Sequence, residues 1–172
     1  MPLYDATVPQ LKKMLGNLER WFDKAEAYAQ SKDFSPDRYL EFRLAPDMFS
    51  WTRQIQAACD TAKFAAARLA GKDAPKHPDE ETTFQELRAR VRSVIDYLDG
   101  FSAGDFEGAD ERIIRLPFLP EGKGVRAGDY LNAFALPNFY FHLATAYDIL
   151  RHNGVDVGKR DFLGGIGELV DV

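Results

Sequence analysis

The sequence is poor in cysteine and has no long hydrophobic run. Of its 172 residues, one is cysteine and three are histidine. Cys59 cannot form a disulfide within the chain, and its alanine-rich surroundings predict a small core residue. No run of roughly 18 apolar residues is free of charge, so no membrane-spanning segment is expected. The first residues, MPLYDATVPQ, lack the basic and apolar regions of a signal peptide. We therefore expect a cytoplasmic protein of bacterial type.

The sequence also lacks a cluster of basic residues. It has 22 Lys and Arg against 27 Asp and Glu, a net charge of −5, and the basic residues are spread along the chain. This pattern argues against a nucleic-acid partner, which needs a concentrated positive surface. Apolar residues make up 45% and aromatic residues 13%, so the chain can bury a core. The length fits a single domain over residues 1–172.

Helical periodicity occurs in four segments, which are approximately 7–30, 46–70, 82–100 and 129–153. Thr7 with Gln10 predicts a capping box at the start of the first helix, and Thr82 with Gln85 predicts one at the third. The arginines of the third segment, at 88, 90 and 92, are expected to form a solvated outer face. Pro137 should kink or divide the fourth helix.

Residues 101–127 interrupt the helical rhythm with glycines and prolines. This segment predicts a long crossover that carries a short irregular hairpin turning at PEGKG. A connection of this length is either a crossover over one end of the bundle or a functional lid. Near the C-terminus, Phe162, Leu163 and Ile166 are expected to pin the chain to the bundle. We therefore predict an all-α four-helix bundle with a long crossover between helices 3 and 4.

Polar residues stand on the apolar stripe of the fourth helix. Asn138 and His142 are four residues apart, which places them on one face, and Thr145 continues that face. Buried polar groups must satisfy each other or something bound. The other two histidines lie elsewhere: His77 is in a connector and should be a surface residue, and His152 is in the last helical turn.

Candidate partners for these groups come from the second helix. They are Asp47 and Gln54, which are seven positions apart and share a face, and Asp60 in the alanine-rich stretch. The sequence leaves open which of the three points inward. The predicted ligand-binding residues are thus His142, Asn138, Thr145, Asp47, Gln54 and Asp60. No catalytic residue is assigned.

Several motifs resemble a known family. His142 followed at eight, nine and twelve positions by Leu, Arg and Gly resembles the last helix of the DinB/YfiT-like superfamily, whose members are four-helix bundles with a long crossover. Within it, the chain resembles the bacterial family of domains of unknown function number nineteen ninety-three. The segments that carry this closer resemblance are RLAPDMF, QIQAACDTAK, EETTFQEL, PNFYFHLATAYDILRHNGV and GKRDFLGG.

The resemblance implies a divalent metal held by three histidines, one on the second helix and two spaced H-x-x-x-H on the fourth. His142 takes the second place of that motif, but Asn138 stands at the first, and residues 46–70 contain no histidine. An amide is a poor ligand for zinc or nickel. We therefore predict a degenerate triad and no metal cofactor. Any divalent metal would need His142 together with a carboxylate such as Asp47 or Asp60.

Three functions follow from these observations. The first is a pocket around His142 and Asn138 that binds a small polar ligand, covered by residues 101–127. The second is a metal- or thiol-dependent transferase with a non-standard site, in which His142 is a ligand or general base. The third is a homodimeric interaction module without catalysis, associating through Trp21, Trp51 and the alanine-rich helix. Whether the protein is an enzyme is left open.

Overall fold

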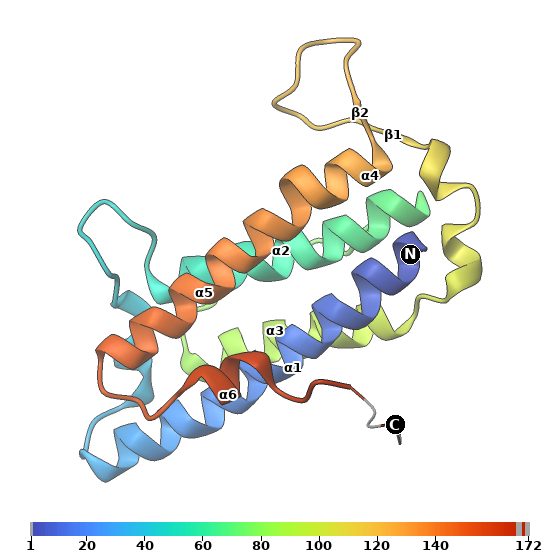
Figure 1. The fold of residues 1–172 in the computed structure, drawn as a ribbon. Helices are drawn as coiled ribbons and strands as arrows, with labels where there is room; N and C mark the ends of the chain where they lie inside the picture. Colours follow the sequence, from blue (N-terminus) through green and yellow to red (C-terminus); the bar gives the residue numbers. More distant parts are fainter. Residues whose placement is uncertain (1, 168–169, 171–172) are drawn as a thin grey trace.

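The computed structural model describes residues 2–167 and residue 170, and helices dominate it. The long helices α1 (Leu3–Ser31), α2 (Trp51–Ala70), α3 (Phe84–Asp99) and α5 (Leu136–His152) lie side by side (Figure 1). Short helical turns occur at η1 (Pro36–Glu41), η2 (Ala103–Phe106), η3 (Ala109–Glu111) and α6 (Lys159–Leu163). The predicted all-α class is confirmed. Within the described residues, no helix is long and apolar enough to span a membrane.

The helices begin at different residues from those predicted. Helix α1 starts at Leu3, directly after Pro2, and the Thr7 hydroxyl donates 2.6 Å to the Leu3 carbonyl inside the first turns. The predicted cap at Thr7 is therefore wrong, because Pro2 already sets the helical entry. Helix α2 starts at Trp51 rather than near Pro46, after Ser50 in an extended conformation.

The capping box of α3 is shifted by one residue from the prediction. The Glu86 backbone amide donates to the Thr83 hydroxyl at 3.2 Å, and the Thr83 amide donates to Glu86 Oε2 at 3.0 Å. Thr82 also donates to this carboxylate from its backbone, at 2.8 Å. The sequence has two adjacent threonines and two adjacent acceptors, Gln85 and Glu86. Glu86 is the better acceptor for two backbone amide groups because its side chain is charged.

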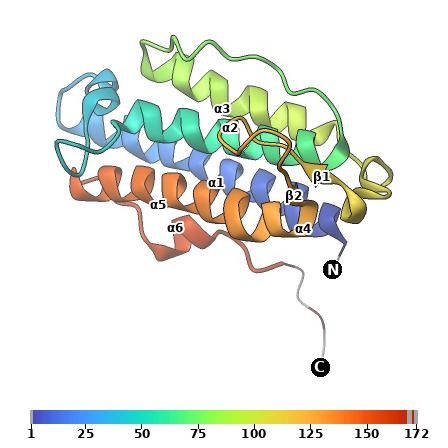
Figure 2. The same cartoon turned by 90° about the horizontal axis from the view of Figure 1, so that it is seen from above.

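The crossover between α3 and the last long helix carries the predicted hairpin. Strand β1 (Ile113–Ile114) pairs antiparallel with β2 (Val125–Arg126), with Ile113 opposite Arg126 and Ile114 opposite Val125. The hairpin and its loop lie at the end of the molecule where α2 ends and α4 (Ala127–Asp129) begins (Figures 1 and 2). Phe118 in this loop is 65% exposed, and Leu116 is buried.

The fourth helical segment is continuous, and Pro137 does not divide it. It runs through α4 (Ala127–Asp129), one π-helical turn η4 (Tyr130–Ala135) and α5, with right-handed helical backbone at Ala135 and Leu136. Pro137 has no backbone N–H, so the carbonyl of Ala133 loses its usual α-helical donor. The wider turn just before the proline accommodates this loss without a break.

Helix α2 lies at the centre of the packing. It contacts α5 on one side and α3 on the other, and α1 contacts all three (Figure 2). Its small side chains permit this close approach, and Ala58, Ala62, Ala65 and Ala66 are fully buried. Cys59 is also fully buried, and burial raises the pKa of its thiol to about 12, so the core role predicted for it is confirmed.

Helix α6 packs on α1 through one aromatic residue. Phe162 stacks on Trp21 at 5.6 Å, and the Trp21 indole N–H donates to the Asp161 carbonyl at 3.1 Å. Phe162 thus pins the chain as predicted, whereas Leu163 is 44% exposed and Ile166 is 85% exposed. The expected anchoring by Ile166 is wrong, because the glycines around it carry the chain away from the bundle.

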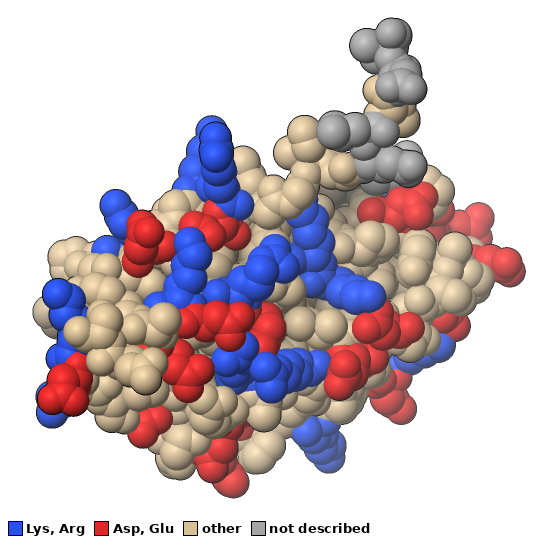
Figure 3. All heavy atoms as spheres, turned by 90° about the horizontal axis from the view of Figure 1, so that it is seen from below, with Lys and Arg blue, Asp and Glu red and all other residues tan. Residues whose placement is uncertain are grey.

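The arginines of α3 are not a solvated face, contrary to prediction. Arg88 and Arg90 are buried and paired with carboxylates from other elements, whereas Arg92 is largely exposed. On the face shown in Figure 3, basic and acidic side chains are intermixed rather than segregated. His77 is half-buried, with Nδ1 2.9 Å from Lys63 Nζ and Nε2 3.2 Å from the Ser93 hydroxyl, so its predicted surface role is also wrong.

Candidate functional site

Two hydrogen bonds join α2 to α5 across their seam. The Asn138 amide donates 2.7 Å to the Thr61 hydroxyl, and His142 Nδ1 lies 2.8 Å from Gln54 Oε1. Because the helices run antiparallel, the two polar pairs follow one another along the seam. Both use residue types that are neutral at neutral pH. The structure therefore brings together three of the predicted site residues, Asn138, His142 and Gln54.

The His142 ring is held on several sides. Gln54 Oε1 is an acceptor, so Nδ1 is the donor and Nε2 keeps its lone pair. Gln54 uses its amide nitrogen on the Phe49 carbonyl at 3.4 Å, and the Phe49 ring stacks on the imidazole at 6.2 Å. Burial lowers the pKa of His142 below its usual value, and the nearby Arg53 guanidinium lowers it further. The imidazole is thus neutral at neutral pH and fixed in one orientation.

The other three predicted residues do not join this group. Thr145 is buried, but its hydroxyl donates to the Phe141 carbonyl of its own helix at 2.8 Å. Asp47 is exposed in the segment ahead of α2, because that helix starts later than predicted. Asp60 turns toward α3, where it pairs with Lys63 and Arg90 at 2.7 Å each.

A pocket of about 250 Å³ opens at the Asn138 end of the seam. Helix α2 supplies Thr61 and Arg68 to its wall, η4 supplies Tyr130, and the crossover supplies Phe118. The remaining lining residues are Asp60, Phe64, Pro117, Phe134 and Asn138. His142 lies one turn further along α5 and does not line the pocket. Pro117 and Phe118, which belong to the segment 101–127, form part of the pocket wall, and a cover over the site stays a prediction.

Thr61, Arg68 and Tyr130 are the polar residues of this pocket that the sequence reasoning missed. The Arg68 guanidinium donates 3.1 Å to the Tyr130 hydroxyl and lies over the Phe64 ring at 4.8 Å. Burial raises the pKa of Tyr130, and Arg68 partly offsets this effect. Tyr130 could have been found by stepping back from His142 in fours, through Asn138 and Phe134. Arg68 offers no comparable signal, because charged residues near helix ends are usually solvated.

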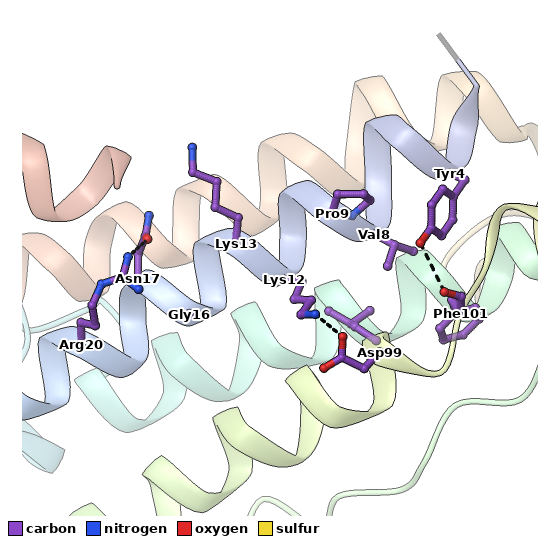
Figure 4. Close-up of a pocket in the computed structure, with 11 residues that line it drawn as sticks. Tyr4, Val8, Pro9, Lys12, Lys13, Gly16, Asn17, Arg20, Asp99 and Phe101 are labelled. Carbon is purple, nitrogen blue, oxygen red and sulfur yellow. Dashed lines mark hydrogen bonds and ion pairs between the residues drawn. The ribbon is translucent and has the colours of Figure 1, made fainter. Parts of the chain in front are cut away.

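A second, larger hollow of about 500 Å³ lies along α1 beside the end of α3 (Figure 4). Most of its polar groups already engage one another. Lys12 pairs with Asp99, Arg20 donates to Asn17, and the Tyr4 hydroxyl donates 3.3 Å to the Phe101 carbonyl. None of the predicted site residues lines it. We therefore place the candidate site at the α2–α5 seam despite its smaller volume.

The residues at the seam do not fit the metal that the resemblance implies. The groups there are one imidazole, two amides and a hydroxyl, and the amide oxygen nearest His142 already accepts its proton. Such a set is a poor one for zinc or nickel. In the described part of the chain, no three His, Cys, Asp or Glu side chains are placed to hold a metal ion.

The dimer contacts expected at the tryptophans are also corrected. Trp21 and Trp51 are fully buried inside the protomer, where Trp51 stacks with Phe84 at 5.7 Å. Both side chains pack entirely within the core, so neither indole can contact a second copy. Dimerisation itself stays a prediction.

Comparison with known proteins identifies the class and then the family. The chain is similar to a solved structure of a DinB family member protein from Shewanella denitrificans, with 51% sequence identity and a TM-score of 0.94. The match covers 98% of this chain and 96% of that chain. The family model described as "Domain of unknown function (DUF1993)" matches residues 3–163, and the chain belongs to this family. No curated protein matches the chain. The resemblance predicted from the sequence is confirmed.

Proposed function

We propose that this DinB-like protein binds a small polar ligand in the pocket between α2 and α5. The observation that carries the proposal is the Asn138–Thr61 pair, which lines a pocket whose wall includes Phe118 of the crossover. Ligand sites of this kind are concave and mostly apolar, with a few convergent polar groups. The walls here are aromatic, and the polar groups come from two different helices.

The π-helical turn adds support. Single π-helical turns inside α-helices occur frequently at functional sites. Here the turn places Tyr130 and Phe134 on the pocket wall just before Asn138. His142 and Gln54 form the next polar pair along the seam, where they fix the spacing of α2 and α5. Their role in this proposal is to position the pocket rather than to contact the ligand.

The test is binding of a mixture of small polar fragments, followed in amide NMR spectra of the isotope-labelled protein. We expect shifts to cluster at Thr61, Phe118 and Asn138. The variant Asn138→Leu should abolish them, because it fills the pocket wall with an apolar side chain. Thr145→Val is the matched control on the same helix, since its hydroxyl serves only its own helix, and it should leave the shifts intact.

Circular dichroism must show that Asn138→Leu is folded. Shifts that persist in this variant, or that cluster at another surface, would show that the proposal is wrong. No observation in the structure favours the transferase, because the seam supplies neither a fitting metal donor set nor an accessible thiol.

A further inference from the structure

The pocket contains an arginine that has no carboxylate partner among the described residues. Arg68 is half-buried at the pocket wall, and the ion pairs within the described part of the chain do not include it. Its guanidinium lies between the Phe64 ring at 4.8 Å and the Tyr130 ring at 5.7 Å. One N–H group is used on the Tyr130 hydroxyl. A guanidinium has five donors in a planar fork, so most of its capacity stays available.

Nearby charges do not neutralise Arg68. Asp60 is the acidic residue of the pocket lining, and it is held by Lys63 and Arg90 at 2.7 Å each. Those two cations are in turn part of a balanced group with Asp79, Glu81 and Arg53. The charges around Asp60 therefore compensate one another, and the positive charge of Arg68 faces the pocket alone. A half-buried cation without a carboxylate partner favours an anion.

The rest of the pocket favours a ligand in which the anionic group is attached to a flat apolar part. Phe118 and Phe134 lie 5.3 Å apart, and Phe134 stacks on Tyr130 at 6.0 Å. Pro117 adds a further apolar surface from the crossover. These aromatic faces run from Arg68 toward Asn138, and ring stacking is favourable at such separations.

From this arrangement we infer that the ligand is a small carboxylate with a flat apolar body. Its carboxylate binds the Arg68 fork beside the Tyr130 hydroxyl, and its body lies against Phe118 and Phe134. This inference rests on the proposed function, since it names the ligand class of the same pocket. It assigns Arg68 and Tyr130 as specificity-determining residues that select an anion over a neutral molecule of the same shape.

The test compares benzoate with benzamide, which has the same ring but no charge. Binding of each is followed by NMR shifts at Phe118 and Asn138, in wild type, Arg68→Gln and Arg126→Gln. Arg126 is exposed on β2, so its variant controls for the loss of one positive charge near the crossover. Benzoate should bind wild type at least tenfold more tightly than benzamide, as a charge-assisted hydrogen bond provides. Arg68→Gln should remove this preference, and Arg126→Gln should keep it.

Each remaining outcome separates the two proposals. Equal binding of benzoate and benzamide, or unchanged benzoate affinity in Arg68→Gln, would overturn the carboxylate inference while the pocket keeps its proposed function. Absence of pocket shifts with either probe and with the fragment mixture would overturn both. Arg68→Lys keeps the positive charge but not the planar fork. Partial benzoate binding by this variant would confirm that Arg68→Gln loses binding because it lacks the charge, and not because it is unfolded.

Discussion

Helix α2 carries polar side chains on two opposite sides, one facing α3 and the other facing α5. The interactions that compensate the burial of these groups differ between the two sides. Toward α3, full charges are buried and paired with one another: Arg90, 3% exposed, contacts Asp60, Asp79 and Glu81 at 2.7 to 2.9 Å. Toward α5, neutral groups pair one to one, and a single arginine faces a pocket. Charges that are already paired with one another inside the protein offer little to a ligand. The comparison therefore assigns stability to the α3 side and binding to the α5 side.

The electrostatics of the α3 side agree with this assignment. Burial opposes the charge of Arg90, but hydrogen bonds with Glu81 and Asp79 and the charge of Asp60 outweigh it and raise the pKa of the guanidinium. For Glu81 and Asp79, burial acts to raise the pKa, and the same hydrogen bonds lower it. Arg90, Glu81 and Asp79 thus hold one another in their charged forms.

The largest effect on stability is expected from Arg90→Met. Removing this guanidinium leaves three carboxylates close together, so the free energy of unfolding should fall by about 3–5 kcal/mol. Urea unfolding followed by the fluorescence of the buried tryptophans measures the change. Arg92→Met is the control from the same helix, because the Arg92 side chain is 57% exposed and its loss should cost less than about 1 kcal/mol. Similar losses for the two variants would contradict the assignment of stability to the α3 side.

A smaller effect is expected from His142→Phe on the α5 side. The ring keeps its packing against Phe49, but Gln54 Oε1 loses its donor, which should cost about 1–3 kcal/mol of unfolding free energy. Gln54→Leu should cost a similar amount. The double variant should cost less than the sum, because it leaves neither partner unpaired.

Strict additivity of the two losses would show that His142 and Gln54 are not coupled. A double-mutant cycle, with urea unfolding of all four proteins, decides between the two results. The same variants should alter fragment binding less than Asn138→Leu does, since His142 lies one turn away from the pocket.

Acid should lower the stability in two separate pH ranges, because histidines and carboxylates titrate at different pH values. Burial lowers the pKa of His142, and burial together with Lys63 lowers that of His77. The unfolded chain therefore binds protons first, near the ordinary histidine pKa of about 6.5, and stability falls as the pH drops below that value. The lowered pKa values of Asp79 and Glu81 act later: their stabilisation is complete above about 4.5 and is lost as the pH falls further.

Unfolding free energies measured from pH 7 to pH 3 should thus decline in two stages. His142→Phe should reduce the first stage, and Arg90→Met should reduce the second. A single decline confined to pH values below 4.5 would show that the histidines are not held neutral in the folded protein.

The sequence predicted the architecture well because periodicity and glycine content are strong local signals. The hairpin at PEGKG, the end of the last helix and the burial of Cys59 all follow from neighbours in the chain. The helix starts at Leu3 and Trp51 were missed, since entry to a helix depends on the preceding backbone as well as on the capping residue. Pro137 was expected to kink or divide the helix; it does not divide it, because a π-helical turn accommodates the missing donor.

The candidate site was only half predictable. Asn138 and His142 were found because they interrupt an apolar stripe, and Gln54 because it could face them. Arg90 and Arg68 were missed for the same reason. From sequence alone, an arginine in a helix is predicted to be solvent-exposed, because its partners come from distant segments of the chain. Asp47 was misplaced because α2 starts later than predicted, and Asp60 because the rotation of α2 cannot be fixed from its alanine-rich sequence.

The smallest effect is expected from Thr145→Val, although the sequence placed Thr145 in the same polar group as His142. The Thr145 hydroxyl bonds the Phe141 carbonyl, which is already an acceptor within the helix, so valine leaves no buried group without a partner. The unfolding free energy should change by less than about 1 kcal/mol, and benzoate binding should not change. If Thr145→Val instead cost as much as His142→Phe, the hydroxyl would belong to the seam network. Its hydrogen bond within its own helix would then not explain its burial, and the polar seam between α2 and α5 would extend one turn further, to Thr145.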